Sequence, residues 1–197
     1  FYALEGNINY SGALIKWLVN DLELIQTSRE SGQFAMQVKD TGGVYFVPAF
    51  SGLGAPYWDN DARAMICGIT AATKKAHLVR AAEEAIAYQI RDITEQLALC
   101  GKTVGLLCVD GGATNDQFLM QFVSDMTGAP LKRSSIEELS AAGAAYLAAL
   151  SVGIATQTEI FSSIEYTQVE PSMQQTQRER LYKGWKKAVA MVTEKKR

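Results

Sequence analysis

The sequence is poor in cysteine, histidine and proline, and these shortages exclude several classes of protein. Of its 197 residues, three are cysteines, one is a histidine and four are prolines. The cysteines contain no Cys-x-x-Cys pair, and no histidine cluster accompanies them. Disulfide scaffolds and zinc sites need more than this. We therefore expect a reduced, cytoplasmic protein.

A strong charge bias and long hydrophobic runs are also absent. The formal net charge is -2, so the basic footprint of a nucleic-acid-binding protein is missing. No run of about 18 apolar residues is present, which argues against a membrane span. Hydrophobic residues make up 48% of the chain, as in an ordinary globular domain. A small anionic ligand remains compatible, because backbone amides bind phosphate without net positive charge.

Helical periodicity is the clearest pattern that is present. The longest predicted helix covers 75–99, where apolar residues recur at steps of three and four. An earlier helix follows Ser11, whose hydroxyl is a predicted N-cap. A small-residue helix over 139–152 is suited to close packing on a sheet, and an amphipathic helix covers 174–195.

Short strands are predicted between these helices. They occupy 43–50, which is rich in β-branched and aromatic residues, and 64–70, 104–109 and 131–134. The continuous apolar run over 104–109 predicts a strand buried on both faces. With no internal repeat or linker, the pattern indicates one α/β domain over the whole chain.

The turn after residue 109 is the first candidate binding element. Asp110-Gly111-Gly112 joins the predicted buried strand to a helix expected from about Asn115. Paired glycines at a helix N-terminus expose backbone amides, to which a phosphate can bind. A purely structural turn is the alternative. Ser11-Gly12 follows the same logic, with a simple helix cap as its alternative. No Gly-x-x-x-x-Gly-Lys-Ser/Thr motif occurs, which excludes a P-loop mechanism.

Other polar residues favour structural roles. His77 lies in the first predicted turn of the 75–99 helix, where a solvated or locally bonded imidazole is expected. Glu83 and Glu84 are adjacent, so they point to different faces of that helix and indicate solvated surface. The aromatic loop 51–59 is either a lid or substrate wall, or a packed surface loop.

Several stretches together resemble the glycerol kinases, within the carbohydrate kinases built on the actin-like ATPase fold. The resemblance spans roughly residues 1 to 155 and resumes in the last helix. The stretches that carry it are Tyr2-Ala3-Leu4-Glu5-Gly6, Gly43 to Trp58, His77 to Ala82, Ala85 to Gln89, Val109 to Gly112, Phe118 to Phe122, Gly143 to Ala148 and Tyr182 to Val189.

The resemblance implies a fold and a reaction. The fold is α/β, of the actin-like ATPase (ribonuclease H-like) type, with helices packed on a mixed sheet. Residues 1–197 are expected to be the C-terminal nucleotide-binding lobe of a two-lobed enzyme. That enzyme would transfer phosphate from ATP, with Mg²⁺, to a hydroxyl of glycerol, giving ADP and glycerol 3-phosphate. A homo-oligomer is implied as well, with no nucleic-acid or membrane partner.

The resemblance also assigns site residues. Nucleotide contacts would come from Gly12, Lys16, Gly112 and Asp116, with Gly111 in the same turn as Gly112. Lys16 stands where glutamine or arginine is common, and all three side chains carry a hydrogen-bond donor. Asp116 stands where asparagine is expected, which removes a donor and adds negative charge.

One further departure and one omission belong to this resemblance. Glu83 stands where the family signature prefers an apolar residue. The family's catalytic aspartate is expected upstream of Phe1. No catalytic residue and no metal ligand is therefore assigned within the chain.

Two alternatives to glycerol phosphorylation stay open. The first is the same reaction on another polyol or on a ketose. The second is a diverged module that binds nucleotide without phosphorylating a metabolite, and Asp116 is the residue that favours it.

Overall fold

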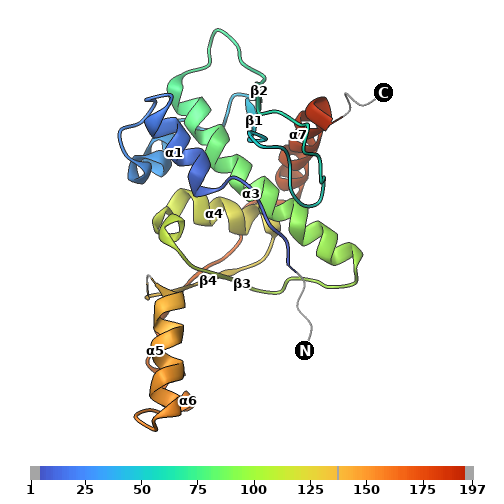
Figure 1. Cartoon of the computed structure of the whole chain (residues 1–197). Helices are drawn as coiled ribbons and strands as arrows, with labels where there is room; N and C mark the ends of the chain where they lie inside the picture. The colour runs from blue at the N-terminus through green and yellow to red at the C-terminus, as the bar shows by residue number, and fades with distance from the viewer. Residues whose placement is uncertain (1–4, 137, 194–197) are drawn as a thin grey trace.

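A computed structural model describes residues 5–136 and 138–193. The elements in chain order are α1 (Gly12–Asn20), the 3-10 turn η1 (Ser28–Glu30), α2 (Ser31–Met36), β1 (Tyr45–Val47), β2 (Met65–Cys67), α3 (Lys75–Leu99), β3 (Leu107–Val109), the 3-10 turn η2 (Gly112–Asn115), α4 (Gln117–Thr127), β4 (Leu131–Ser134), α5 (Leu139–Ser151), α6 (Gln157–Ser162), β5 (Tyr166–Val169) and α7 (Gln175–Thr193). These elements form a helical body and a separate projecting arm (Figure 1).

Helix α3 is the centre of the body. It contacts α1, α2, α4, α7 and β1 (Figure 1). Its bounds, Lys75–Leu99, confirm the predicted helix. Tyr88 on α3 stacks on Trp185 of α7, with ring centroids 5.4 Å apart, and both side chains are fully buried. His77 caps the start of the helix by accepting a hydrogen bond at Nδ1 from the Lys74 amide, as expected of a locally bonded imidazole.

The strands form two small sheets. Strands β1 and β2 pair antiparallel, with Tyr45 opposite Cys67. The second sheet has the order β3-β4-β5 and is mixed, because β3 runs parallel to β4 and β5 antiparallel to it. The predicted mixed sheet with packed helices is therefore confirmed, although the strands are divided between two sheets.

Strand β3 is much less buried than predicted. It is an edge strand of only Leu107–Val109, and none of its residues is fully buried. Leu106, just before it, is 45% exposed. The expectation of a strand covered on both faces over 104–109 was wrong. An apolar run indicates that a strand tends to be buried, but it does not show which elements cover it. Here β4 pairs with one edge of β3, and no described strand pairs with the other edge.

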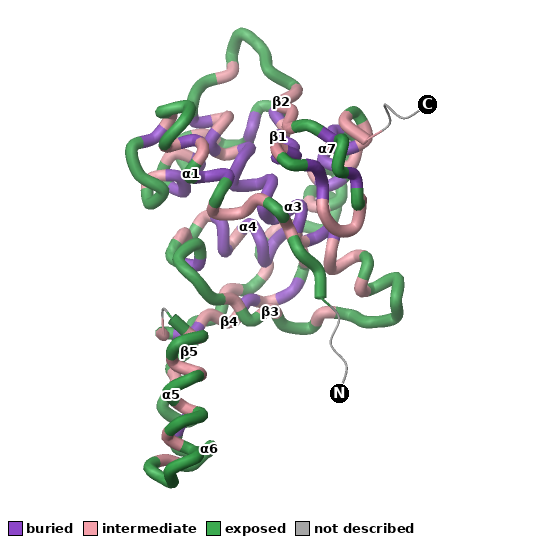
Figure 2. The backbone as a smooth tube through the Cα atoms, viewed as in Figure 1, coloured by how far each residue is buried: buried purple, intermediate pink, exposed green. Residues whose placement is uncertain are grey.

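Helices α5 and α6 project from the body as an arm (Figure 1). Helix α5 has the predicted position but no buried residue, and Figure 2 shows it exposed or half-exposed along its length. Leu147 on α5 is 70% exposed and Phe161 on α6 is 58% exposed. The prediction that this helix packs on a sheet was wrong for this chain. Its sequence predicts an apolar helix but does not identify the covering surface.

Helix α7 is tied to α3 through Asp92. This carboxylate is 1% exposed and accepts hydrogen bonds from the Tyr182 hydroxyl and from the Trp185 indole nitrogen, the latter at 2.8 Å. Lys186 adds an ion pair, with 3.3 Å between its Nζ and Asp92 Oδ1. A buried charge with this many partners binds the two helices together.

The aromatic loop 51–59 is a packed loop. Leu53 and Asp59 exchange backbone hydrogen bonds across it at 2.8 and 3.0 Å. The Tyr57 hydroxyl accepts a hydrogen bond from Lys186 Nζ at 2.8 Å, which anchors the loop on α7. These contacts favour the interpretation as a packed surface loop.

Candidate functional site

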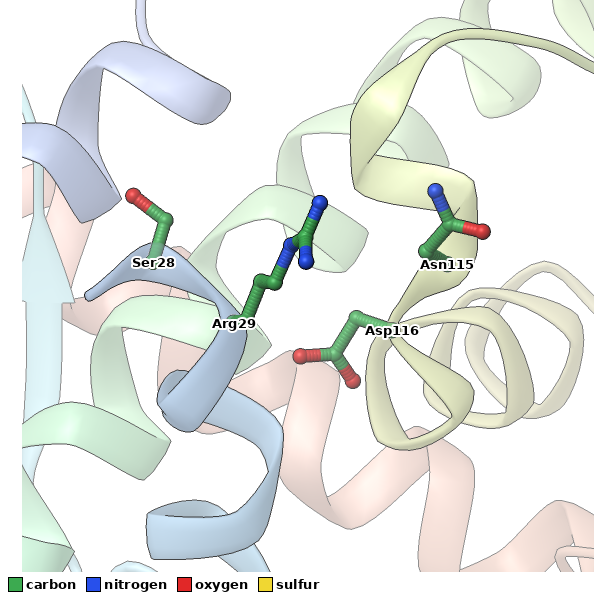
Figure 3. A pocket seen from close by; sticks show the side chains of 4 residues that line it. All are labelled: Ser28, Arg29, Asn115 and Asp116. Carbon is green, nitrogen blue, oxygen red and sulfur yellow. The ribbon is translucent and has the colours of Figure 1, made fainter. Parts of the chain in front are cut away.

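Two turns far apart in the sequence face each other across a hollow. Ser28 and Arg29 belong to η1, and Asn115 and Asp116 lie at the junction of η2 with α4. The cavity between them has a volume of about 440 Å³. Figure 3 shows Arg29 extending its guanidinium group toward the segment that carries Asn115 and Asp116. An exposed arginine at the wall of a cavity is suited to an anionic group.

A smaller cavity of about 180 Å³ adjoins the first and shares Ser28 and Asp116 with it. Its walls come from α1, η1, α2, α3, η2 and the start of α4. The lining residues are Gly12, Ile15, Lys16, Ser28, Ser31, Glu83, Ile86, Ala113, Asp116 and Leu119.

The structure thus brings together most of the residues that the sequence suggested. Gly12 and Lys16 on α1 and Asp116 before α4 line one cavity, although they are distant in the sequence. Gly111 and Gly112 lie in the turn that leads to it, and their neighbour Ala113 is the residue of that turn that lines it. Ser11 precedes α1, but its side chain makes no capping hydrogen bond, so that prediction was wrong.

Gly111 and Gly112 differ in what they require. Gly111 has a φ of 91°, a backbone conformation that favours glycine. Its carbonyl accepts hydrogen bonds from the Thr114 amide and hydroxyl, at 3.0 and 2.8 Å. A Cβ on Gly112 would meet no atom within 4 Å. Gly111 therefore shapes the turn, whereas Gly112 leaves open space beside it.

Asp116 has a structural contact that the sequence reasoning missed. It is the N-cap of α4, and its Oδ1 accepts a hydrogen bond from the Leu119 amide at 3.0 Å. The predicted helix therefore begins at Gln117, after a 3-10 turn, and not directly from the glycine pair near Asn115. The carboxylate also packs against Gly32, where a methyl group would overlap it. A carboxylate complements the positive end of the helix as well.

Glu83 and Glu84 are not at the surface, which corrects the expectation drawn from their adjacency. Glu83 is 1% exposed and Glu84 is 3% exposed, because α3 is covered on several sides. Glu84 is held by Arg80 at 2.8 Å and by the Tyr88 hydroxyl at 3.0 Å. Oε2 of Glu83 has no hydrogen-bond partner within the described part of the chain.

The surroundings of Glu83 perturb its ionisation. Burial and the negative charge of Asp116 raise the pKa of the Glu83 carboxyl to about 8. A hydrogen bond from Ser31 opposes this shift without cancelling it. Glu83 is therefore mostly protonated near neutral pH, while lining a cavity beside a second carboxyl group.

Several lining residues carry no recognisable sequence signal. Ser28 and Arg29 lie in an irregular segment with no periodicity, and Asn115 was expected only as the start of a helix. Asn115 accepts a hydrogen bond from Arg133 of β4, which places a second arginine near the larger cavity. A metal cage is not formed: residues 5–136 and 138–193 contain no cluster of three or more histidine, cysteine or acidic side chains.

A family model matches most of the chain. Residues 1–152 match the C-terminal domain of the FGGY family of carbohydrate kinases. The chain belongs to this family. The resemblance to carbohydrate kinases is thereby confirmed. No helix among the described residues combines the length and apolar character needed to cross a bilayer.

Relatives of this FGGY domain include glycerol kinases. The chain is 50% identical to the glycerol kinase of Carboxydothermus hydrogenoformans over 196 residues, covering 98% of this chain and 39% of that protein. It is 48% identical to glycerol kinase 2 of Thermotoga maritima over 193 residues, covering 96% and 39%. The chain thus spans about two fifths of these relatives.

Solved structures show the same fold. The Plasmodium falciparum glycerol kinase with ADP superposes with a TM-score of 0.82 at 35% identity, over 92% of this chain and 37% of that one. A ligand-bound xylulose kinase from Lactobacillus acidophilus gives 0.78 at 22% identity, over 96% and 40%. The actin-like ATPase fold expected from the sequence is confirmed.

Proposed function

We propose that this FGGY domain is the nucleotide-binding lobe of an ATP-dependent glycerol kinase. The observation that carries the proposal is the shared cavity of Gly12, Lys16 and Asp116, which joins separate segments in a chain similar to glycerol kinases. The product would be glycerol 3-phosphate, made in the cytoplasm.

The assignment of residues 1–197 to one lobe has its own support. The glycerol kinases that match are more than twice as long as this chain. Helix α5 carries exposed apolar side chains, such as Leu147 at 70%. Exposed apolar surface of this kind marks an interface. The second lobe, with the polyol pocket and the aspartate that accepts the hydroxyl proton, would come from sequence outside these residues.

The contribution of this lobe is mainly positioning and charge compensation. In phosphoryl transfer, the enzyme holds the nucleotide in line with the acceptor and stabilises the charge on the phosphates. Lys16 and Arg29 would attract the phosphates. Gly112 would allow their close approach, and Gly111 would keep the turn open.

Mg²⁺ would supply additional charge neutralisation on the nucleotide. It is commonly bound by one or two carboxylates together with substrate phosphates and waters, rather than by a protein cage. The described residues fit that mode, since Asp116 borders the larger cavity without further acidic residues lining it. Assembly of the whole protein into a homo-oligomer stays a prediction.

The experiment is a substrate panel on the full-length protein. Glycerol, xylulose and gluconate are each offered with ATP and Mg²⁺, and ADP release is measured. Glycerol should give the highest kcat/KM. A higher value for another polyol or a ketose would support the first alternative. ADP binding without turnover of any acceptor would support the non-catalytic module that Asp116 favours.

The chain by itself should bind nucleotide but should not phosphorylate glycerol, because the proton acceptor is proposed to lie in the other lobe. ATP-dependent glycerol phosphorylation by the purified 197-residue chain would contradict this division of labour.

A further inference from the structure

Arg133 joins the turn proposed to bind phosphate to the sheet beside it. Strands β3 and β4 run parallel, and Arg133 pairs with Val109, the last residue of β3. The chain then passes through Gly111 into η2, whose last residue is Asn115. Arg133 donates a hydrogen bond from Nη2 to Oδ1 of Asn115. Within the described ranges, no other hydrogen bond connects η2 with a strand.

The alternation of β4 directs Arg133 to the covered face of the sheet. Successive side chains of a strand point to opposite faces, so Arg133 shares its face with Leu131. Leu131 is 1% exposed and belongs to the same core as Leu119 of α4. Lys132 takes the other face, where its Nζ lies 3.7 Å from the centre of the Tyr166 ring. Of these two neighbouring cations, Arg133 is the one that faces the side on which η2 and α4 begin.

No acidic side chain among the described residues competes with Asn115 for Arg133. The ion pairs in this part of the chain involve Arg80, Arg91 and Lys186, and Arg133 takes part in none of them. Its guanidinium group therefore remains available to the amide oxygen of Asn115. A hydrogen bond with a charged donor is roughly twice as strong as one between neutral groups. Arg133 thus holds the end of η2 firmly.

The turn that Arg133 holds contains two glycines, so it gains from an external contact. Gly111 adopts a φ of 91°, and glycine loses more conformational freedom on ordering than any other residue. Inside the turn, the Gly111 carbonyl accepts hydrogen bonds from the amide and the hydroxyl of Thr114. Outside it, Arg133 fixes Asn115, one residue further on. A ligand that meets a turn already ordered avoids part of the entropic cost of binding.

We propose that Arg133 is a positioning residue for the phosphates of the bound nucleotide. It acts through Asn115, which it holds in place, and so keeps Gly112 ready for the close approach of a phosphate. Arg133 itself touches no ligand in this arrangement. The inference rests on the proposed function, since it assumes that a nucleotide places its phosphates at this turn.

The test compares ADP with adenosine, which lacks phosphates, by calorimetry on the full-length protein. Arg133→Ala should weaken ADP binding about fivefold, in the range of one hydrogen bond, and leave the Kd of adenosine within about twofold. A variant that merely damaged the fold would weaken the binding of both ligands. Circular dichroism checks folding. Arg133→Met, which keeps a long side chain without a donor, replaces Arg133→Ala if that variant does not fold.

Lys132→Ala is the matched control. It removes the neighbouring cation of the same strand from the opposite face, so it should leave both Kd values unchanged. A loss of ADP affinity equal to that of Arg133→Ala would show that only the overall charge of β4 matters.

A double-mutant cycle tests whether Arg133 acts through Asn115. Asn115→Ala should weaken ADP binding by a similar factor, and Arg133→Ala should add at most about a twofold loss in that background. Independent losses that multiply to about 25-fold would show that Arg133 acts on the phosphates without Asn115.

Four results overturn the inference and leave the proposed function intact. They are an unchanged ADP Kd in folded Arg133→Ala, equal losses for ADP and adenosine, an equal loss in the Lys132→Ala control, and multiplying losses in the cycle. A wild-type protein that binds no ADP overturns the proposed function, and the inference with it.

Discussion

Glu83 and Asp92 lie on the same helix, α3, and each is 1% exposed, but their surroundings differ. Asp92 accepts hydrogen bonds from Tyr182 and Trp185 and pairs with Lys186. Glu83 faces a cavity, and its Oε2 has no hydrogen-bond partner among the described residues. The C-terminal half of α3 thus carries a buried charge with several partners, and the N-terminal half carries a buried acid with one oxygen unpaired. The degree of burial therefore does not distinguish Glu83 from Asp92, but the number of hydrogen-bond and ion-pair partners does.

The Asp92 end should be the more sensitive to mutation. Asp92→Ala leaves the Tyr182 hydroxyl, the Trp185 indole nitrogen and the Lys186 ammonium group without their shared acceptor. Breaking a buried charge network by removing one partner costs about 3–5 kcal/mol. Urea unfolding should show a loss of this size. Asp21→Ala, at an exposed position, is the control and should change the free energy of unfolding little. An equal loss of unfolding free energy in both variants would contradict the structural role of Asp92.

Glu83 should instead make the stability of the fold depend on pH. The pKa of Glu83 rises from 4.5 in the unfolded chain to about 8 in the fold. Between these values the folded state binds more protons than the unfolded state, so stability falls as pH rises. From pH 5 to pH 8 the loss from this group is about 3 kcal/mol, at about 1.4 kcal/mol per pKa unit.

Glu83→Leu removes this dependence and gives the measurement. The difference in free energy of unfolding between the variant and the wild type should grow in favour of the variant as pH rises from 5 to 8. Other titrating groups cancel in that difference. A constant difference across this range would show that Glu83 ionises normally.

The glycine pair allows structural and binding roles to be separated for the backbone as well. Gly112→Ala should preserve the fold, because a Cβ there meets open space. It should weaken ADP binding on the order of tenfold, about 1.4 kcal/mol, if the nucleotide approaches this turn closely. Calorimetry with circular dichroism as the folding check tests both parts. Unchanged ADP affinity in the folded variant would show that Gly112 has no role in nucleotide binding.

Lys16 should give the smallest effect. Its side chain is exposed, and exposed charge interactions contribute about 0.2–1 kcal/mol. Lys16→Ala should therefore weaken ADP binding by a few-fold at low salt, and the difference should shrink as salt screens the charge. Titrations at two salt concentrations would reveal this. A difference that is insensitive to salt would point to a direct hydrogen bond.

The sequence predicted the long elements well and the environment of particular side chains poorly. The apolar stripe over 75–99 gave the bounds of α3, because periodicity is a local property, and the short strand predicted over 131–134 is β4. Burial is not local. Glu83 and Glu84 were placed at the surface by a rule for helices with one solvated face, and α3 has neighbours on several sides.

Most of the candidate site was reached through motif positions, not through physical chemistry. Gly12, Lys16 and Asp116 came from the resemblance, and the structure places them around one cavity. Arg29 was missed because a short 3-10 turn has no periodic signature. The partner of Asp116, the Leu119 amide, depends on where α4 begins, and helix ends are the least certain part of any sequence-based assignment.

The projecting arm of α5 and α6 has a hydrodynamic consequence. A compact domain of 197 residues has a radius of gyration of about 16 Å. Holding two helices away from the body moves mass outward, so the isolated chain should scatter and diffuse as a larger particle than its length implies (Figure 1). Because the arm presents residues such as Leu147 and Ile154, at 70% and 81% exposure, self-association at high concentration should enlarge that particle further.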